Sequence, residues 1–307
     1  MSAALPACWC AGSRRPWSSA GRDPARARAA AHEADTGRPR GAGPARGAAW
    51  PPVTRAGPAT GVVAGGVLAG LAAQAGPALL ALERLRPLAP AQLAGRGDPV
   101  HAALTFDDGP VAASTPAVLA ALDRLGWRAT FFMLGEEVRR APGLAAEVAA
   151  AGHEVAVHGD DHASLLRRGP LATLDGLCRA RDVVASATGD QPAWFRPAYG
   201  VLTGAALAAA ARLGLRPVLW TAWGRDWRAE ATPASIIADL AAGRLAGGTL
   251  LLHDYAASGS WRATVAALPR LAELLDRRHL AAGPLGEHGL PAGRRNARRP
   301  PGGRPPR

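Results

Sequence analysis

From residue 100 onward, short apolar runs alternate with longer segments in which apolar residues recur at helical spacing. The short runs have the length and bounding residues of buried strands, and the longer segments have those of amphipathic helices. The predicted strands span 101–106, 129–134, 154–158, 194–196, 216–220 and 249–253, and the predicted helices span 114–125, 142–151, 171–187, 203–213, 233–245 and 261–278. Repeated strand–helix units predict a parallel sheet covered by helices, as an open doubly wound sheet or a barrel.

The regions outside this pattern divide the rest of the chain. Residues 1–60 alternate Arg, Pro, Gly and Ala without an apolar period and are predicted to be disordered. Residues 291–307 have the same character and are predicted to form a basic disordered tail. Residues 83–99 contain several prolines and are predicted to be a linker leading into a folded domain over 100–290.

Residues 61–82 are uncharged and rich in Ala, Gly, Leu and Val. Their number exceeds the roughly 20 apolar residues that a helix needs to cross a bilayer. Several glycines and a proline dilute the apolar character of the segment, so two interpretations stay open. It is a membrane anchor or signal-like segment, or it is an amphipathic helix on the surface of the domain.

Composition adds an apparent excess of positive charge, with a net charge of +12. All of this excess lies in residues 1–60 and 291–307, because residues 61–290 contain as many acidic as basic side chains. The folded part therefore lacks the basic surface expected of a nucleic-acid-binding protein. The three cysteines cannot form a disulfide framework, and Cys178 is predicted to be a small buried apolar residue.

Two adjacent carboxylates, Asp107 and Asp108, end the first predicted strand and precede a Gly-Pro turn. Neighbouring side chains at a strand end point to opposite sides unless the turn redirects them. A divalent metal on one carboxylate and an arginine beside the other would relieve their repulsion and leave a ligand next to a general base. The alternative is an ordinary turn in which an aspartate caps the following helix.

A second group, His158-Gly159-Asp160-Asp161-His162, follows another predicted strand. Two histidines four residues apart can bind one metal if the intervening turn is helical. Together with Asp108 they would form a two-His, one-Asp site with open positions for water and substrate. Solvent-exposed residues near a helix cap are the alternative interpretation of the histidine pair.

Three further predicted strands end in charged, aromatic or histidine residues. The segments are Phe195-Arg196-Pro197-Ala198-Tyr199-Gly200, Trp223-Gly224-Arg225-Asp226-Trp227 and Leu250-Leu251-Leu252-His253-Asp254. Each one alone has a structural explanation, as an ion pair, core aromatics or a satisfied buried histidine. Five such strand ends in one chain favour a functional site, because buried strand termini do not need these residues for stability.

These five segments, in this order over residues 101–289, resemble the polysaccharide deacetylases, carbohydrate esterases related to the nodulation chitooligosaccharide deacetylases. The Thr-Phe-Asp-Asp-Gly-Pro segment with a downstream His-x-x-x-His pair carries most of the resemblance. It implies a distorted (β/α) barrel with fewer than eight complete strand–helix units. It also implies one bound divalent metal ion, usually Zn²⁺, with other divalent transition metals as alternatives.

The resemblance also implies roles for individual residues. Asp107 matches the catalytic base, and Asp108, His158 and His162 match the metal ligands. Arg196 matches the residue that holds the base, and the backbone N–H of Tyr199 matches an oxyanion donor. Asp226 matches the carboxylate that orients the general acid, His253. Trp227 and Leu251 match the residues that line the pocket for the acetyl methyl group.

Two positions depart from the family pattern. Gly159 stands where Ser or Thr commonly follows the first metal histidine. A glycine cannot supply the side-chain hydroxyl that would support this loop by hydrogen bonding. The fourth segment is compressed ahead of Asp226, which makes its match the weakest of the five.

The resemblance implies a hydrolase that removes acetyl groups, mainly N-acetyl groups of N-acetylglucosamine-type residues, from a glycan such as peptidoglycan or a chitin-like polymer. The alternative is a catalytically silent carbohydrate-binding protein on the same fold. An acetylated glycan is the expected partner, nucleic acid is not expected, and 61–82 is a candidate for membrane anchoring. The expected location is the cell envelope, anchored or secreted, with the cytoplasm still open, and no feature indicates an oligomeric state.

Overall fold

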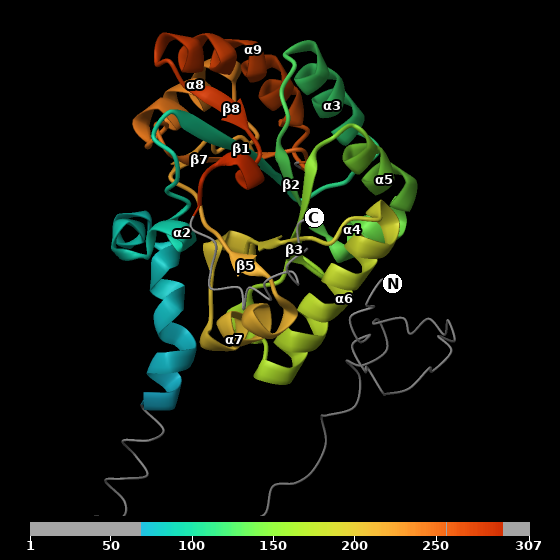
Figure 1. The fold of residues 1–307 in the computed structure, drawn as a ribbon, viewed down its shortest axis with the longest axis vertical. Coiled ribbons are helices and arrows are strands. Elements are labelled where there is room, and N and C mark those ends of the chain that lie inside the picture. Colours follow the sequence, from blue (N-terminus) through green and yellow to red (C-terminus); the bar gives the residue numbers. More distant parts are fainter. Residues whose placement is uncertain (1–68, 256, 291–307) are drawn as a thin grey trace, which may run out of the picture. The chain divides into compact units, whose positions relative to one another are not determined.

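The computed structural model describes residues 69–255 and 257–290, and the predictions for 1–60 and 291–307 lie outside these residues. The described part contains one parallel sheet with the strand order β5-β4-β3-β2-β1-β7-β6, and β8 pairs with the first residues of β1. The strands are β1 His101–Asp107, β2 Thr130–Leu134, β3 Glu154–Gly159, β4 Trp194–Phe195, β5 Arg216–Pro217, β6 Ala222–Trp223, β7 Thr249–His253 and β8 Ala281–Gly283. This sheet is the predicted distorted barrel, and helices cover its outside (Figure 1).

The helices lie close to the ranges predicted from their apolar spacing, with α2 and α4 as additions. The α-helices are α2 Ala91–Ala94, α3 Thr115–Arg124, α4 Gly135–Arg140, α5 Pro142–Ala150, α6 Pro170–Thr188, α7 Gly204–Leu213, α8 Pro233–Ala242 and α9 Trp261–Arg277. The 3₁₀ helices are η2 Gly76–Ala81, η3 Glu83–Leu88, η4 Leu165–Arg167, η5 Ala198–Gly200 and η6 Leu285–Glu287, and residues 69–75 are also helical. Local signals set several ends: Thr232 and Ser235 form a capping box at α8, and Gly189 and Gly214 end α6 and α7 in the left-handed conformation.

The alternation of side chains along β1 separates two apolar layers. Leu104 and Phe106 belong to the large core between the sheet and the outer helices. Ala103 instead packs inside the barrel with a cluster that includes Phe132 and Trp194. Because the side-chain period of a strand is two, Thr105 and Asp107 share the inward side of β1 with Ala103. A buried carboxylate therefore lies at the inner end of the central strand.

The sheet order begins at β5 and ends at β6, and residues before β1 are hydrogen-bonded to the chain just after β5 and at the start of β7. The Leu219 N–H, just after β5, donates to the Leu93 carbonyl at 2.8 Å. The Thr249 hydroxyl, at the start of β7, donates to the Gly95 carbonyl at 2.8 Å. The stretch predicted as a linker, 83–99, thus contains η3 and α2 and is hydrogen-bonded to the sheet.

The anchor prediction for 61–82 falls partly outside the described residues. Within the described ones, η2 contacts η5 near the end of β4. No helix in the part of the chain that the structure describes is both long and apolar enough to cross a membrane.

Two histidines that are buried away from the carboxyl ends of the strands should make the folded protein less stable in acid. Burial lowers the pKa of His153 and of His288 to about 4, with Arg128 adding to the effect at His153 and His101 at His288. Unfolded histidines titrate near 6.5, so between pH 6.5 and 4 the unfolded chain binds protons that the folded chain excludes. The contribution of these two histidines to the free energy of unfolding should therefore be fully present above pH 6.5 and should be lost as the pH drops toward 4.

Melting temperatures measured from pH 7 to 4 check this expectation for the wild type and His153→Asn. The amide oxygen of Asn lies near the position of His153 Nδ1 and can still accept the hydrogen bond that the Ala129 N–H donates to it, at 3.2 Å. We expect the variant to lose several degrees less than the wild type over this pH range. Equal losses in the two proteins would exclude His153 as a source of the acid sensitivity.

Candidate active site

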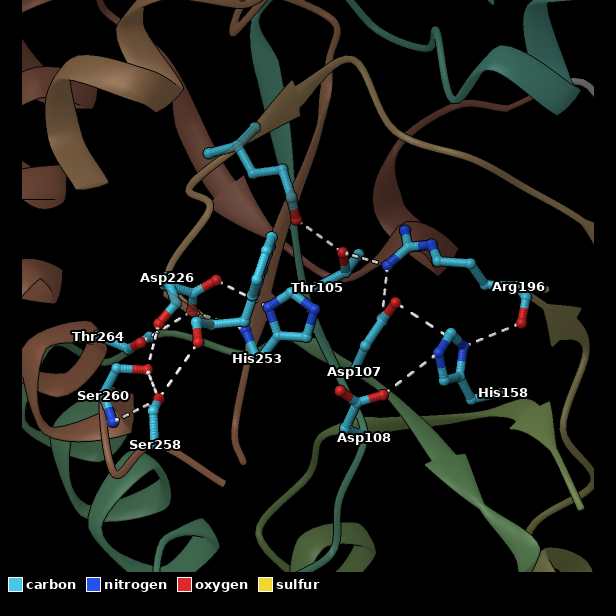
Figure 2. A network of polar contacts seen from close by, with 12 residues as sticks. Thr105, Asp107, Asp108, His158, Arg196, Asp226, His253, Ser258, Ser260 and Thr264 are labelled. Atoms are coloured by element: carbon cyan, nitrogen blue, oxygen red, sulfur yellow. Dashed lines mark hydrogen bonds and ion pairs between the residues drawn. The ribbon is translucent and has the colours of Figure 1, made fainter. Parts of the chain in front are cut away.

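The polar residues singled out in the sequence gather at the carboxyl ends of neighbouring parallel strands. Asp107 ends β1, and His253 ends β7 opposite it in the strand register. His158 lies near the end of β3, and Arg196 directly follows β4. In barrels of parallel strands this edge is where catalytic residues collect. Figure 2 shows these side chains converging from their separate strands.

Asp107 is held by a completely buried arginine. Arg196 Nη1 donates to Asp107 Oδ1 at 2.7 Å and to the Thr105 hydroxyl at 2.8 Å, and Nη2 donates to the Leu219 carbonyl at 3.3 Å. Burial lowers the pKa of Arg196, while the charge and hydrogen bond of Asp107 oppose that shift. A buried charge pair of this kind fixes the orientation of Asp107, because the arginine is held by three acceptors at once.

Asp108 has a left-handed backbone conformation with φ of +80°. Few non-glycine residues adopt this conformation, and here it redirects Asp108 away from the strand alternation. Asp108 Oδ1 lies 3.4 Å from His158 Nε2 and 3.4 Å from His162 Nε2. The two adjacent aspartates therefore face one site, as the metal-and-base interpretation requires.

Asp108, His158 and His162 form a group whose ligand atoms all lie within 4.8 Å of one another. Asp108 Oδ1 is buried and has no hydrogen-bond donor in the described part of the chain. Burial would raise the pKa of this carboxyl, but the close approach of His158 and the nearby histidine charges lower it well below its usual range. An ionised, unpartnered carboxylate oxygen between two imidazole nitrogens fits a divalent metal ion.

The hydrogen bond of His158 selects the tautomer that a metal ligand needs. His158 Nδ1 lies 2.9 Å from the Arg196 carbonyl oxygen, which can only accept, so Nδ1 carries the proton. This leaves Nε2, the atom near Asp108, as the possible ligand. Burial lowers the pKa of His158, but Asp107 and Asp108 raise it more, so the net direction is upward. The carboxylates of Asp107 and Asp108 therefore favour a positive charge at the position of the His158 ring.

The loop between the two histidines is a bend and not the helical turn assumed from their spacing. Gly159 has φ of +129°, which L side chains rarely adopt, so the backbone here explains why neither Ser nor Thr occupies this position. Ion pairs support the loop: Asp160 accepts from Arg139 Nη1 at 2.7 Å and from Arg179 Nε at 2.9 Å, and Asp161 pairs with Arg168.

Asp226 and His253 form a second buried pair on the other side of Asp107. Asp226 Oδ1 lies 2.7 Å from His253 Nδ1, and Oδ2 accepts from the His253 N–H and the Thr264 hydroxyl, both at 2.8 Å. Burial lowers the pKa of His253, but Asp226 raises it more through its charge and hydrogen bond, to about 9. His253 is therefore cationic at neutral pH and can donate a proton. In Figure 2 its imidazole lies between Asp226 and Asp107.

Tyr199, Trp227 and Leu251 lie around the site in different settings. Tyr199 has φ of +59°, and its ring contacts that of His162 edge-on with centroids 4.4 Å apart. Leu251 is buried, whereas Trp227 is 48% exposed. Trp223 links them: it pairs with Leu251 in the β6–β7 register and stacks on Trp227 with centroids 6.3 Å apart. Trp223 was not assigned a role from the sequence.

Asp254 is another residue that the sequence interpretation did not assign. Its Oδ1 accepts from the Gly109 N–H at 2.9 Å, and its Oδ2 accepts from the Thr115 hydroxyl at 2.6 Å. A Cβ on Gly109 would lie 2.0 Å from Asp254 Oδ2, so only glycine allows this close approach. Burial raises the pKa of Asp254 to about 7. Asp254 thus holds the turn that follows Asp108 in place through these hydrogen bonds. In the sequence, only its position directly after His253 indicated a role for Asp254.

The chain matches known proteins over the region that builds this site. Residues 94–218 match the family model described as polysaccharide deacetylase. A chitooligosaccharide deacetylase of Bradyrhizobium sp. (strain ANU 289) is 37% identical over 192 residues, which cover 59% of this chain and 87% of the relative. A peptidoglycan N-acetylglucosamine deacetylase of Listeria monocytogenes is 34% identical over 152 residues, covering 50% of this chain but only 32% of that longer protein.

A solved structure is similar to this chain over the same region. A family 4 carbohydrate esterase from Streptomyces lividans, determined in complex with acetate, superposes with a TM-score of 0.54 at 33% identity. The match covers 60% of this chain and 91% of the esterase.

Proposed function

This chain belongs to the polysaccharide deacetylase family, and from that premise we propose that it removes N-acetyl groups from N-acetylglucosamine-type residues of a glycan. The observation that carries the proposal is the arrangement around Asp107. An Asp-His-His group lies on one side of it, and a cationic histidine lies on the other. The alternative of a silent carbohydrate-binding protein is disfavoured, because such a protein would not need a buried base–arginine pair and a buried Asp–His pair at one site.

The metal ion would be held by Asp108, His158 and His162. We propose Zn²⁺, because imidazole nitrogen is one of its preferred ligands in proteins. A bound divalent ion supplies a Lewis acid that polarises the acetyl carbonyl and makes water more acidic.

The protein side chains then divide the proton transfers of amide hydrolysis. Asp107, oriented by Arg196, accepts a proton from the attacking water as the new carbon–oxygen bond forms. The Tyr199 N–H donates to the oxygen of the acetyl carbonyl as negative charge develops there. His253 donates its proton to the sugar nitrogen as the carbon–nitrogen bond breaks, so acetate and a free amine leave.

His253→Ala should separate amide hydrolysis from ester hydrolysis. An amine leaving group needs the proton of His253, whereas the phenolate of an activated acetyl ester departs without it. We expect kcat on an N-acetyl glycan to fall by roughly 10²–10⁴-fold, and kcat on the activated ester to fall far less. Acetate release from both substrates checks this, and equal losses on the two would deny His253 the role of general acid.

The proposed substrate class supports the cell envelope as the expected site of action. The names of the relatives give chitooligosaccharides and peptidoglycan as their substrates, and peptidoglycan is a glycan of the cell envelope. Anchoring through 61–82 stays a prediction. Fractionation of cells into cytosol, membrane and medium tests the location independently of the chemistry.

A panel of substrates tests the proposed function itself. Acetate should be released from N-acetylglucosamine oligomers or peptidoglycan fragments, in amounts equal to the new free amines. O-acetylated xylan oligomers serve as the comparison for ester cleavage. Release only from the O-acetylated sugars would replace the N-acetyl proposal with an esterase.

A further inference from the structure

Arg86 is a buried cation that lies outside the residues matched by the family model. It belongs to η3, in the stretch predicted as a linker, and is 7% exposed. Its Nε donates to the Leu80 carbonyl at 3.2 Å, and its Nη2 donates to the Ala81 carbonyl at 3.1 Å. Burial lowers the pKa of Arg86 to about 10, so the side chain is still cationic at neutral pH.

The guanidinium of Arg86 lies over a tryptophan that in turn contacts the loop of Tyr199. Arg86 Cζ is 3.8 Å from the centroid of the Trp220 ring. The far edge of that ring lies against Gly200, where an added Cβ would be 2.9 Å from Trp220 Cη2. Gly200 has φ of +69° and follows Tyr199, so the ring packs on the turn that presents the Tyr199 N–H.

Trp220 also lies next to the arginine that orients Asp107. Arg196 Cζ is 6.0 Å from the centroid of the Trp220 ring, so this indole lies near a second guanidinium group. A second contact from the residues before β1 reaches the first turn of α7, which follows the Tyr199 turn in the chain. The Gln74 side-chain oxygen accepts from the Ala205 N–H at 2.9 Å, and η2 contacts η5.

We propose that Arg86 is a positioning residue: it holds Trp220 against the Gly200 backbone and thereby fixes the Tyr199 turn relative to the base. Contacts on both sides of this turn come from residues 74–86, before the matched family region, so this segment would complete the active site of the barrel. The inference rests on the proposed deacetylation, in which the Tyr199 N–H stabilises the oxyanion.

Arg86→Met in the full-length, metal-loaded protein tests this role, with Arg84→Met as the matched control. Arg84 belongs to the same 3₁₀ helix but is exposed, so the control makes the same chemical change away from Trp220. Misplacing a catalytic group by about 1 Å can cost up to about 10²-fold in rate, so we expect Arg86→Met to lower kcat roughly tenfold with KM nearly unchanged. Arg86→Lys keeps a cation near the ring and should recover most of the lost kcat.

The rates are expressed per mole of bound metal, so that a loss of folded protein is not counted as a loss of kcat. If Arg86→Met matches Arg84→Met in kcat, or raises KM alone, the positioning role is wrong. If Arg86→Met does not fold, Arg86→Gln, which also removes the cation, takes its place with Arg84→Gln as the control: a kcat clearly below that of Arg84→Gln at equal KM supports the role, and equality contradicts it. If neither the wild type nor Arg84→Met releases acetate, the proposed function fails instead.

Discussion

Asp107→Asn should reduce deacetylation by roughly 10²–10⁴-fold, the usual contribution of a positioned general base, while the bound metal stays in place. The amide of Asn has nearly the shape of the carboxylate but cannot accept a proton from water. Asp108, the neighbouring residue proposed as a ligand, is unchanged, so metal content should remain that of the wild type. Acetate release and elemental analysis of the same preparation measure the two quantities together.

Asp98→Asn provides the control for this variant, because it makes the same change just before the other end of β1. In the described part of the chain, the Asp98 carboxylate accepts one hydrogen bond, from the nearby Val100 N–H. We expect nearly wild-type rates from the control. Arg196 loses its carboxylate partner in Asp107→Asn, so melting temperatures should accompany the rates. Activity above about a tenth of the wild type would contradict the assignment of Asp107 as general base.

His158→Ala should remove both the metal and the activity. The wild type should bind about one divalent ion per chain, as expected of a mononuclear site. His158 is the most buried of the three proposed ligands, and its Nε2 is oriented by the hydrogen bond of Nδ1 to the Arg196 carbonyl. Removing it leaves one carboxylate and one partly exposed imidazole, which cannot retain the ion through dialysis.

His279→Ala is the matched control for the metal measurement, because His279 is exposed in the turn that follows α9. It should retain the metal content and the rate of the wild type. Full metal content in His158→Ala would show that the ion binds elsewhere, whatever the activity of that variant.

The sequence was sufficient to predict the strands with continuous apolar runs. β1, β2, β3 and β7 lie within a residue of their predicted ranges, because strands buried on both faces leave an uninterrupted apolar segment. β6 and β8 were missed, since Ala222–Trp223 and Ala281–Gly283 are too short to show a period. α4 was missed for a related reason: six mostly charged residues contain too few apolar positions to reveal a helix.

The predicted site residues also come together, but the means by which they do so could not be inferred. The left-handed φ of Asp108 and the bend at Gly159 are backbone conformations that no local pattern specified. Asp254 lies 145 residues from Gly109, which it holds, and Arg86 lies far in sequence from Trp220. Such contacts depend on the tertiary fold, whereas the side chains predicted to be catalytic are indicated by their charge and by their position at strand ends.

The most direct test of the account is to assay one preparation on an N-acetylglucosamine oligomer before chelation, after chelation, and after one equivalent of Zn²⁺ is restored. Acetate and free amine are measured together in each state. The account predicts equal amounts of both products before chelation, loss of both after it, and recovery when the ion returns, with no recovery in His158→Ala. Undiminished release of acetate and amine from the metal-free protein would contradict it.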